Sequence, residues 1–291
     1  MPPVTDSTGD AIDDRVFVLG AGRAGRGLTR ALRTAGVNVV GLHGRRSDAA
    51  APDPVSAGPL PVSLADAGVV LVAVQDAALD AAIDELLAGP LAAGAALLQA
   101  SGSATPARLD EARRRGHPSG TFHPLVPLAD PARAPGLLRG GWVGLDGDAD
   151  AVDAGRRLAV ALGASTLLIP PGQKARYHAA AVFASNFPTV LAAIAERLMR
   201  EAGVDAASGT DAVRALLAAA AANVASGDTR AALTGPVVRG DAVTIGRHLD
   251  ALSSDEEARD VYRCLSRAAL SMMPAGQGSE KIRELLGEAS R

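Results

Sequence analysis

The stretch RVFVLGAGRAGRGLTRALRTAG, residues 15–36, decides the fold of this chain. Its first six residues are mostly apolar, end in glycine and predict a buried strand. Residues 23–36 predict a helix that closes at a glycine, a common helix stop. Between the two, Gly20, Gly22 and Gly25 have the spacing G-x-G-x-x-G. A strand, this spacing and a helix in that order predict a dinucleotide-binding turn; the alternative is an ordinary strand–helix turn.

Each glycine of this loop has a separate physical role. The first permits a tight turn, the second lets the backbone approach a pyrophosphate, and the third lets the helix pack close to the strand. The start of the helix then offers unpaired N–H groups and partial positive charge to a phosphate. We therefore expect five residues of the loop to contact the cofactor, namely Gly20, Gly22, Arg23, Ala24 and Gly25.

The glycine loop begins a longer alternation of strands and helices. Runs that predict strands recur along the first 170 residues, at 15–20, 37–44, 67–76, 94–102, 120–124, 140–147 and 164–170. Predicted helices lie between several of them, at 23–36, 78–89, 105–116 and 148–163. This alternation indicates a doubly wound α/β sheet of the Rossmann-like kind.

The strand pattern stops at Pro170-Pro171-Gly172. The remaining residues predict helices alone, at about 174–202, 210–225, 241–252, 255–271 and 279–289. We therefore divide the chain into a polar leader expected to be disordered (1–14), a Rossmann-like domain (15–170) and an all-helical domain (171–291).

The residues after the second predicted strand indicate which nucleotide the loop prefers. NAD and FAD sites place an acidic residue about 20 residues beyond the glycines, where it holds the ribose 2′-hydroxyl. Here the strand runs into His43, Gly44, Arg45, Arg46 and Ser47, with no acid among them. Two guanidinium groups and a hydroxyl suit a 2′-phosphate, because arginine makes charge-assisted bonds to it. The sequence predicts NADP(H); the alternative is a solvated basic loop, with His43 at the surface.

Polar residues follow three later strands. Ligands of doubly wound sheets bind at the carboxyl ends of strands, which here are Gln75-Asp76, Ser101-Gly102 and His123-Pro124. We expect Gln75 and Ser101 to contact the cofactor, with a turn role as the alternative for Ser101. Asp76 is expected to cap the next helix. Histidine titrates near neutrality, so His123 is a candidate contact for substrate or nicotinamide, or else has a local structural role.

Composition and charge argue against several classes of function. The chain has 29 basic and 32 acidic residues, a net charge of −3, so it has no general attraction for nucleic acid or anionic membranes. Its single cysteine, Cys264, excludes an internal disulfide and fits the cytoplasm, where we expect the protein. We expect no signal peptide and no transmembrane helix. The five histidines lack close ligand spacing, so we expect no metal site.

The segment KARYHAAAVFASNFP, residues 174–188, concentrates aromatic and polar residues where the helices begin. At about 100° per residue, Lys174, His178 and Ser185 share one face of a helix, with Asn186 at its edge. We expect this face to form one wall of a substrate cleft. The alternative is a well-packed helix at the domain junction.

Four segments together carry a resemblance: LGAGRAGRGL, FHP, YHAAAVFASN and LTGPVVRGD. Over residues 15–270 the chain resembles bacterial Rossmann-like proteins with a C-terminal domain of unknown function. That family is similar in architecture to the ketopantoate reductases, pyrroline-5-carboxylate reductases and β-hydroxyacid dehydrogenases. The resemblance implies an NADP-dependent reductase. Its helical domain would be of the 6-phosphogluconate-dehydrogenase C-terminal type, lie beside the cofactor cleft, bind the substrate and form a homodimer.

One feature of those relatives is missing. Ketopantoate reductases and β-hydroxyacid dehydrogenases place a lysine and an asparagine four residues apart on the first helix of the second domain. Here Val182 lies four residues from both His178 and Asn186. Lys174 precedes Asn186 by about 18 Å of helix, too far for both to hold one carbonyl in an unbroken helix. Pro188 is expected to kink the helix.

Reduction of a carbonyl or imine needs a hydride from the cofactor and a proton donor nearby. His178 is the first candidate donor and His123 the second, while Asn186 would orient the substrate. Asp241 is expected to cap a helix. The segment LTGPVVRGDAVTIGRHL adds three further polar candidates, namely Thr234, Arg239 and His248.

Two functions of different classes remain open. The first is NADPH-dependent reduction of a small carbonyl or imine acid, with ketopantoate as the best specific guess and pyrroline-5-carboxylate as the next. The second is an NADP-binding sensor or scaffold that kept the fold and lost the lysine–asparagine chemistry. A panel of substrates, monitored through NADPH oxidation, distinguishes the two.

Overall fold

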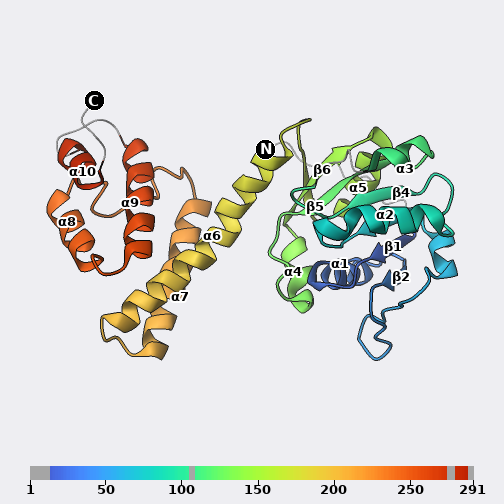
Figure 1. Cartoon of the computed structure of the whole chain (residues 1–291), viewed down its shortest axis with the longest axis horizontal. Helices are drawn as coiled ribbons and strands as arrows, with labels where there is room; N and C mark the ends of the chain where they lie inside the picture. Colours follow the sequence, from blue (N-terminus) through green and yellow to red (C-terminus); the bar gives the residue numbers. More distant parts are fainter. Residues whose placement is uncertain (1–13, 105–108, 274–278, 288–291) are drawn as a thin grey trace. The chain divides into compact units, whose positions relative to one another are not determined.

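The computed structural model of the chain shows a part built on a sheet, followed by helices (Figure 1). It describes residues 14–104, 109–273 and 279–287. The expected leader lies outside these residues except for its last position. Asp14 is described, and its carboxylate forms an ion pair with Arg157 at 2.6 Å.

The chain forms two compact units, Met1–Ser185 and Asn186–Arg291, which are described here one at a time. The division falls inside α6 (Lys174–Glu201), a helix that continues across Pro188. The predicted boundary at residue 170 marks another feature, the end of the last strand. The fold class is as predicted: a Rossmann-like sheet with helices, and then helices alone.

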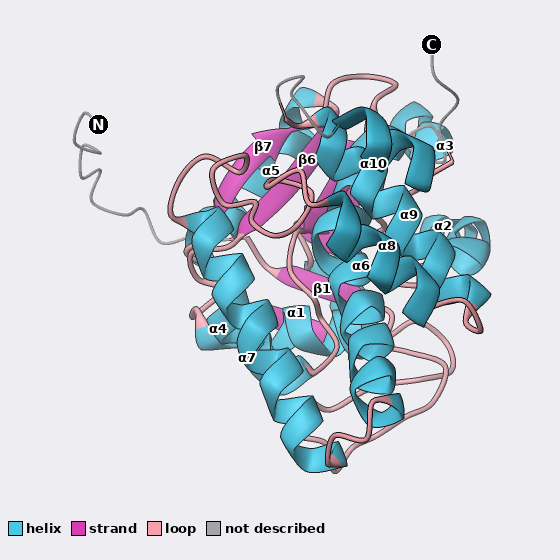
Figure 2. Cartoon of the chain, turned by 90° about the vertical axis from the view of Figure 1, so that its left-hand side faces the viewer, coloured by secondary structure: helices cyan, strands magenta, loops and turns pink. Residues whose placement is uncertain are grey.

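The first unit is built on a seven-stranded sheet, whose strands are magenta in Figure 2. Along the sheet the order is β2-β1-β3-β4-β5-β6-β7. The strands are β1 (Val16–Leu19), β2 (Val39–His43), β3 (Val69–Val72), β4 (Ala96–Gln99), β5 (Ser119–Pro124), β6 (Trp142–Gly147) and β7 (Ser165–Leu168). All seven predicted strands are present. Neighbours are parallel except β5 and β6, whose antiparallel pairing an apolar run in the sequence does not reveal.

Helices cover both faces of this sheet, which explains why its strands are apolar at consecutive positions. In β1, Val16 and Val18 pack into the core under α1, α4 and α5. Phe17 and Leu19 point the other way, into the core under α2 and α3. The bounds of these helices are α1 (Arg23–Thr34), α2 (Leu79–Ala88), α3 (Asp110–Arg114), α4 (Ala134–Leu138) and α5 (Ala149–Ala161). Helix α4 was not predicted, because it is a short helix that contains proline and glycine.

The described residues of the second unit form helices joined by turns and loops. The unit contains the later part of α6, then α7 (Ala206–Ala225), α8 (Ala242–Ala251), α9 (Glu256–Ser271) and α10 (Ser279–Leu285). A small core that includes Ile245, Leu270 and Ile282 holds α8, α9 and α10 together. Asp241 caps α8 as predicted, since its carboxylate accepts hydrogen bonds from the amide and the hydroxyl of Thr244.

Helix α6 is apolar without being buried. Among the described residues it is the one helix long and apolar enough to cross a membrane, with a mean hydropathy of 1.4 over a window of which none is buried. This is a statement of length and composition, and the expectation of no transmembrane helix stays a prediction. One such helix is weak evidence, however, because apolar side chains exposed on a single chain are also what an interface between two chains presents.

Candidate functional site

The glycine loop joins β1 to α1, at the point where the strand order reverses between β1 and β3. A Cβ added to Gly20 would overlap the carbonyl oxygen of Ala73, and one on Gly25 would overlap the carbonyl oxygen of Gly20. Gly20 is therefore required where the chain leaving β1 passes close to the end of β3, and Gly25 where the helix approaches the end of the strand. A Cβ on Gly22, in contrast, would meet no atom within 4 Å, so the space beside this residue is open.

The start of α1 offers unpaired backbone donors beside that open space. Its N-cap is Gly22, which has no side-chain cap, and the first turn contains no acidic residue. Uncapped N–H groups and the positive end of the helix dipole favour an anion. Arg23 and Ala24 form the first turn itself. The loop thus fits a pyrophosphate at the place where the sequence predicts one.

The basic loop after β2 has the exposure that a phosphate site needs. Arg45, Arg46 and Ser47 are all exposed. The acid that follows them, Asp48, accepts a hydrogen bond from Arg26 at 3.0 Å, so its charge is paired. His43 differs from the prediction: it is 4% exposed, with Nδ1 2.9 Å from the hydroxyl of Ser56. It is buried because the chain at Ser56 pairs beside it.

The carboxyl ends of β1, β3, β4 and β5 lie at one edge of the sheet, because these neighbours are parallel. Gln75 is exposed there. The hydroxyl of Ser101 accepts hydrogen bonds from the amides of Ser103 and Ala104 at 3.1 and 2.9 Å, which gives it a role in the turn. Asp76 does not cap α2, whose N-cap lacks a side-chain bond; its carboxylate accepts from the Ser103 hydroxyl instead.

Two predicted histidines meet at this edge. The rings of His123, from β5, and His178, from the second turn of α6, have centroids 5.6 Å apart. A Cβ on Gly102 would overlap Nδ1 of His178 and lie 2.7 Å from Nε2 of His123, so both rings converge on this glycine. Nδ1 of His178 is buried and makes no hydrogen bond within the described part of the chain. A buried nitrogen without a partner is a candidate ligand contact.

Lys174 does not lie on the wall of a cleft, contrary to the prediction. It is 4% exposed, and its ammonium donates to the hydroxyl of Thr121 at 2.6 Å. Burial lowers the pKa of Lys174 to about 8, against the opposing effect of Asp146 and Asp76. Lys174 and His178 do lie on one face of α6, as predicted. The first turn of that face packs against β5, however, and does not border an open cleft. Ser185, which shares that phase, is exposed.

Around Lys174 lies a set of buried polar side chains. Thr121 also accepts a hydrogen bond from Nε2 of Gln99, at 3.2 Å, and faces Asp146 across the β5–β6 ladder. Burial raises the pKa of Asp146, and the Lys174 charge opposes that rise. Oε1 of Gln99 and Oδ1 of Asp146 are buried without a hydrogen bond among the described residues. The carboxyl side of β4 and β5 is therefore polar beneath α6, while the rest of the sheet is apolar.

The first turns of α6 match the β5 strand in spacing. Lys174 and His178 are one helical turn apart, about 6 Å along the axis. Thr121 and His123 are two residues apart on one face of β5, which is about 6.6 Å. The helix can therefore place Lys174 at Thr121 and His178 at His123 at the same time.

Tyr177 is held at the same place. Its hydroxyl lies 2.8 Å from Nδ1 of His123, with the two rings edge to face. Burial, together with the charges of His178 and Lys174, lowers the pKa of His123 to about 4. Burial also raises the pKa of Tyr177 well above its ordinary value. At neutral pH the pair is therefore a neutral imidazole and an intact phenol.

Several residues that the sequence singled out belong to the second unit. Asn186, Thr234 and Arg239 are exposed. His248 is hydrogen-bonded through Nδ1 to the hydroxyl of Tyr262, at 2.9 Å. Their roles at a site in the first unit stay predictions.

Sequence reasoning missed Thr121, Asp146 and Gly144, although a signal was present. Polar residues recur at every second position of β5, at Ser119, Thr121 and His123. That period marks a polar face on an otherwise apolar strand. The last residues of the strand, His123 and Pro124, do not reveal this face by themselves.

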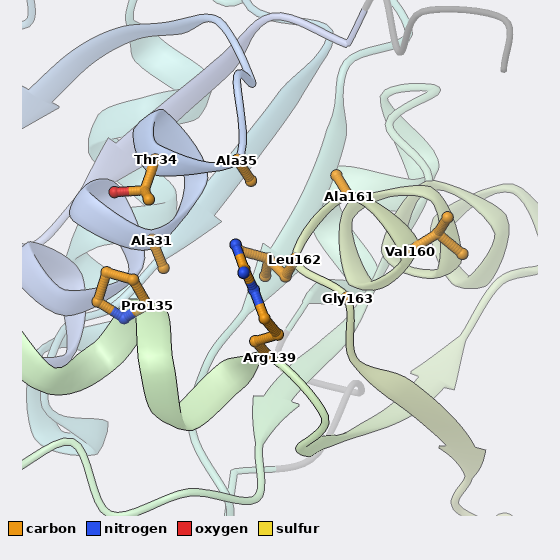
Figure 3. Close-up of a pocket in the computed structure, with 9 residues that line it drawn as sticks. All are labelled: Ala31, Thr34, Ala35, Pro135, Arg139, Val160, Ala161, Leu162 and Gly163. Atoms are coloured by element: carbon orange, nitrogen blue, oxygen red, sulfur yellow. The ribbon is translucent and has the colours of Figure 1, made fainter.

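Two surface hollows, of about 320 and 340 Å³, lie away from this site. The first is drawn in Figure 3, where the end of α1 at Thr34 and Ala35 faces Arg139 and the end of α5. Because α1 starts at the glycine loop, its far end marks the opposite edge of the sheet. The hollow holds one charged side chain among small and apolar ones, and we assign it no role.

Comparison with known proteins agrees with the fold. Residues 142–269 match the model of a family described as a domain of unknown function (DUF2520). This segment begins at β6 and ends within α9. The resemblance to Rossmann-like proteins with such a C-terminal domain is confirmed. No curated protein matches the chain.

Solved structures of similar fold include reductases. A Bacteroides fragilis protein, BF3122, provisionally named an NADP oxidoreductase, is 23% identical with a TM-score of 0.70, over 90% of this chain and 100% of its own. An imine reductase from Myxococcus stipitatus, solved with NADP+, is 20% identical with a TM-score of 0.58, over 88% and 92%. A pyrroline-5-carboxylate reductase from Coxiella burnetii is 14% identical with a TM-score of 0.60, over 96% and 100%. At these identities the likeness shows the fold.

Proposed function

We propose that this protein is an NADP(H)-dependent oxidoreductase that reduces a small carbonyl or imine acid. The observation that carries the proposal is the convergence of His123 and His178 on Gly102. That glycine lies in the turn after β4 (Ala96–Gln99), at the same edge of the sheet as the glycine loop, where ligands of doubly wound sheets bind. The solved neighbours that bind NADP or reduce imines support this choice.

Two groups of residues would bind different parts of the cofactor. The loop from Gly20 to Gly25 would hold the pyrophosphate, through the open space at Gly22 and the uncapped start of α1. Arg45, Arg46 and Ser47 would hold the 2′-phosphate, and Gln75 would border the cofactor at the end of β3. When bound, NADPH supplies the hydride of the reaction.

The substrate would lie beside the two imidazoles. Nδ1 of His178 is the buried nitrogen that a substrate heteroatom can satisfy. The buried cation of Lys174 lies close behind His123 and favours a substrate that carries a carboxylate. Imine and pyrroline reductases among the solved neighbours lead us to place cyclic imine acids first and keto acids such as ketopantoate second.

A substrate panel tests this function. Purified protein is mixed with NADPH and a series of cyclic imine acids and 2-keto acids, and loss of NADPH absorbance is followed. We expect turnover with at least one member and a fall in kcat/KM of roughly 10-fold or more in His178→Ala, because the substrate heteroatom loses its hydrogen bond to this imidazole. Arg156→Ala, at an exposed residue of α5, serves as the control and should retain activity. Consistent silence over the panel would contradict a reductase and favour a sensor or scaffold that binds NADP.

We also propose that the second unit forms a homodimer through α6 and α7. Apolar side chains along these helices are exposed, including Val190 at 51%, Leu216 at 65% and Val224 at 49%. The two helices touch near their connecting turn, where Gly209 packs against Met199. An apolar surface of this kind is typical of a permanent interface between identical chains.

A further inference from the structure

Tyr177 is a half-buried polar group of the site that the proposed reduction does not yet use. It lies on the first turn of α6, and its hydroxyl reaches Nδ1 of His123 at 2.8 Å. The atoms around the hydroxyl hold it in position for this hydrogen bond to His123.

A missing side chain on β6 makes that contact possible. Gly144 pairs with His123 across the antiparallel β5–β6 ladder. A Cβ on Gly144 would overlap the Tyr177 hydroxyl, so the phenol fills the space that glycine leaves beside the histidine. Glycine within a strand often marks such a close approach. The position of the hydroxyl is therefore set by the sheet as well as by the helix.

The direction of the hydrogen bond follows from the partners on each side. If Nδ1 carried the hydrogen and donated, the phenol hydrogen would have no acceptor, because the hydroxyl makes no second hydrogen bond with any described residue. If the phenol donates, both groups are satisfied. His123 is then a neutral imidazole with its hydrogen on Nε2, the nitrogen that lies beside Gly102.

We propose that Tyr177 is a positioning residue that fixes the tautomer of His123 and returns a proton to it. The hydroxyl donates to Nδ1, so that Nε2–H faces the end of β4, where the substrate would lie. This inference rests on the proposed reductase function for the second step, the return of the proton.

Reduction delivers one hydride and one proton to the substrate. The substrate carbon gains the hydride, with its electron pair, and the C=O or C=N π bond breaks. The substrate oxygen or nitrogen gains the Nε2 proton of His123, and the Tyr177 proton moves to Nδ1. The phenolate that remains is strongly disfavoured by burial, so the proton on Nδ1 returns to it. Nε2 of His123 then takes one proton from water, which restores the starting tautomer.

The first experiment reads the tautomer without any substrate. Full-length protein with 15N-labelled histidine is examined by long-range 1H–15N NMR, with the His123 signals assigned by their loss in His123→Gln. We expect an unprotonated Nδ1 and a protonated Nε2 in the wild type. Tyr177→Phe keeps the ring and removes the donor, so the His123 signals should move toward a mixture of tautomers. His117 and His248 provide internal controls whose signals should not move.

A second variant tests the space on β6. Gly144→Ala should displace the hydroxyl and alter the His123 tautomer as Tyr177→Phe does. Gly136→Ala is the matched control, because its Cβ would meet no atom within 4 Å. A wild type with the hydrogen on Nδ1, or a tautomer unchanged by Tyr177→Phe, would overturn the proposal.

A kinetic arm separates this inference from the proposed function. With any substrate found by the panel, Tyr177→Phe should lower kcat roughly 10-fold or more, shift its pH profile and leave the KM for NADPH within about two-fold. Unchanged kcat in Tyr177→Phe would refute the return of the proton. Failure of the wild type on every substrate would refute the reductase function instead, while the tautomer measurement still decides what Tyr177 does to His123.

Discussion

Two glycines of the same loop differ in what a methyl group would meet. Beside Gly25 it would meet the backbone of Gly20, whereas beside Gly22 it would meet nothing within 4 Å. The first glycine thus serves the fold, while the second leaves room for a ligand. These are the roles expected for the second and third glycines of the G-x-G-x-x-G motif.

We therefore predict opposite outcomes for two substitutions. Gly22→Ala should fold with a Tm within about 2 °C of the wild type, but bind NADPH at least about 10-fold more weakly, because the methyl group occupies the approach to the pyrophosphate. Gly25→Ala should fail to fold or lose several kcal/mol, as expected for a forced backbone shift. Calorimetric titration and thermal melts measure both. Full NADPH affinity in Gly22→Ala would place the pyrophosphate elsewhere.

Arg45 and Arg46 carry the choice between the two nicotinamide cofactors. The double variant Arg45→Ala/Arg46→Ala should weaken NADPH roughly 10- to 100-fold, because charge-assisted bonds to the 2′-phosphate are lost. Its affinity for NADH, which lacks that phosphate, should change little. Thermal-shift titrations with both nucleotides measure the preference, with the exposed Arg214→Ala as control. Equal binding of the two nucleotides by the wild type would refute the assignment.

At the residue scale, sequence reasoning found the rare polar residues but not their surroundings. It identified His123 and His178 because one ends a strand and the other lies on the first helix after the sheet. It placed Lys174 at a cleft, since helical phase is the same whether a face meets solvent or a sheet. The contact between Tyr177 and His123 joins distant parts of the sequence, so local sequence patterns could not predict it.

At the scale of elements, the start of α6 is anchored on the sheet through a buried lysine. Lys174 lies against β5 at Thr121 and near Asp146 of β6. The pKa of Lys174 falls from 10.5 in the unfolded chain to about 8 in the fold. Between these values the unfolded chain binds more protons, so stability from this group rises with pH. Below about pH 8 the burial of charged Lys174 lowers the free energy of unfolding by its full amount.

Lys174→Met should remove this pH dependence. Relative to the variant, the wild type should gain about 1–3 kcal/mol in free energy of unfolding as the pH rises from 8 to 10.5. Urea unfolding at several pH values measures the difference. Lys281→Met, at an exposed lysine of α10, is the control and should show no such trend. A difference independent of pH would mean that Lys174 keeps its ordinary pKa in the fold.

Most elements could be predicted, because apolar runs and glycine stops mark them locally. All seven strands and the long helices appear within a few residues of their predicted ends. Helix α4 escaped prediction, as did the antiparallel direction of β6. Strand direction is decided by which neighbour a strand joins, and that information is not local.

At the scale of the whole molecule, the exposed apolar residues of α6 and α7 form the surface of the proposed homodimer interface. Leu216→Glu should shift the protein from two chains to one, with a mass of 29.2 kDa, because a carboxylate would be buried without a counter-charge at the interface. Light scattering with size-exclusion chromatography measures the mass, and the exposed Asp211→Ala is the control. A wild type that is monomeric, or that sediments with membranes and needs detergent, would contradict the homodimer.

The contact of Tyr177 with Gly144 also has a consequence for how this chain can diverge. A larger residue at 144 removes the room for the phenol, and loss of the phenol leaves His123 without its donor. The three positions are thus expected to be inherited together, although they lie on two strands and a helix. Relatives that keep histidine, glycine and tyrosine at these positions should share the same proton chemistry. Those that have lost the tyrosine are released from the glycine and should protonate their substrates by another route.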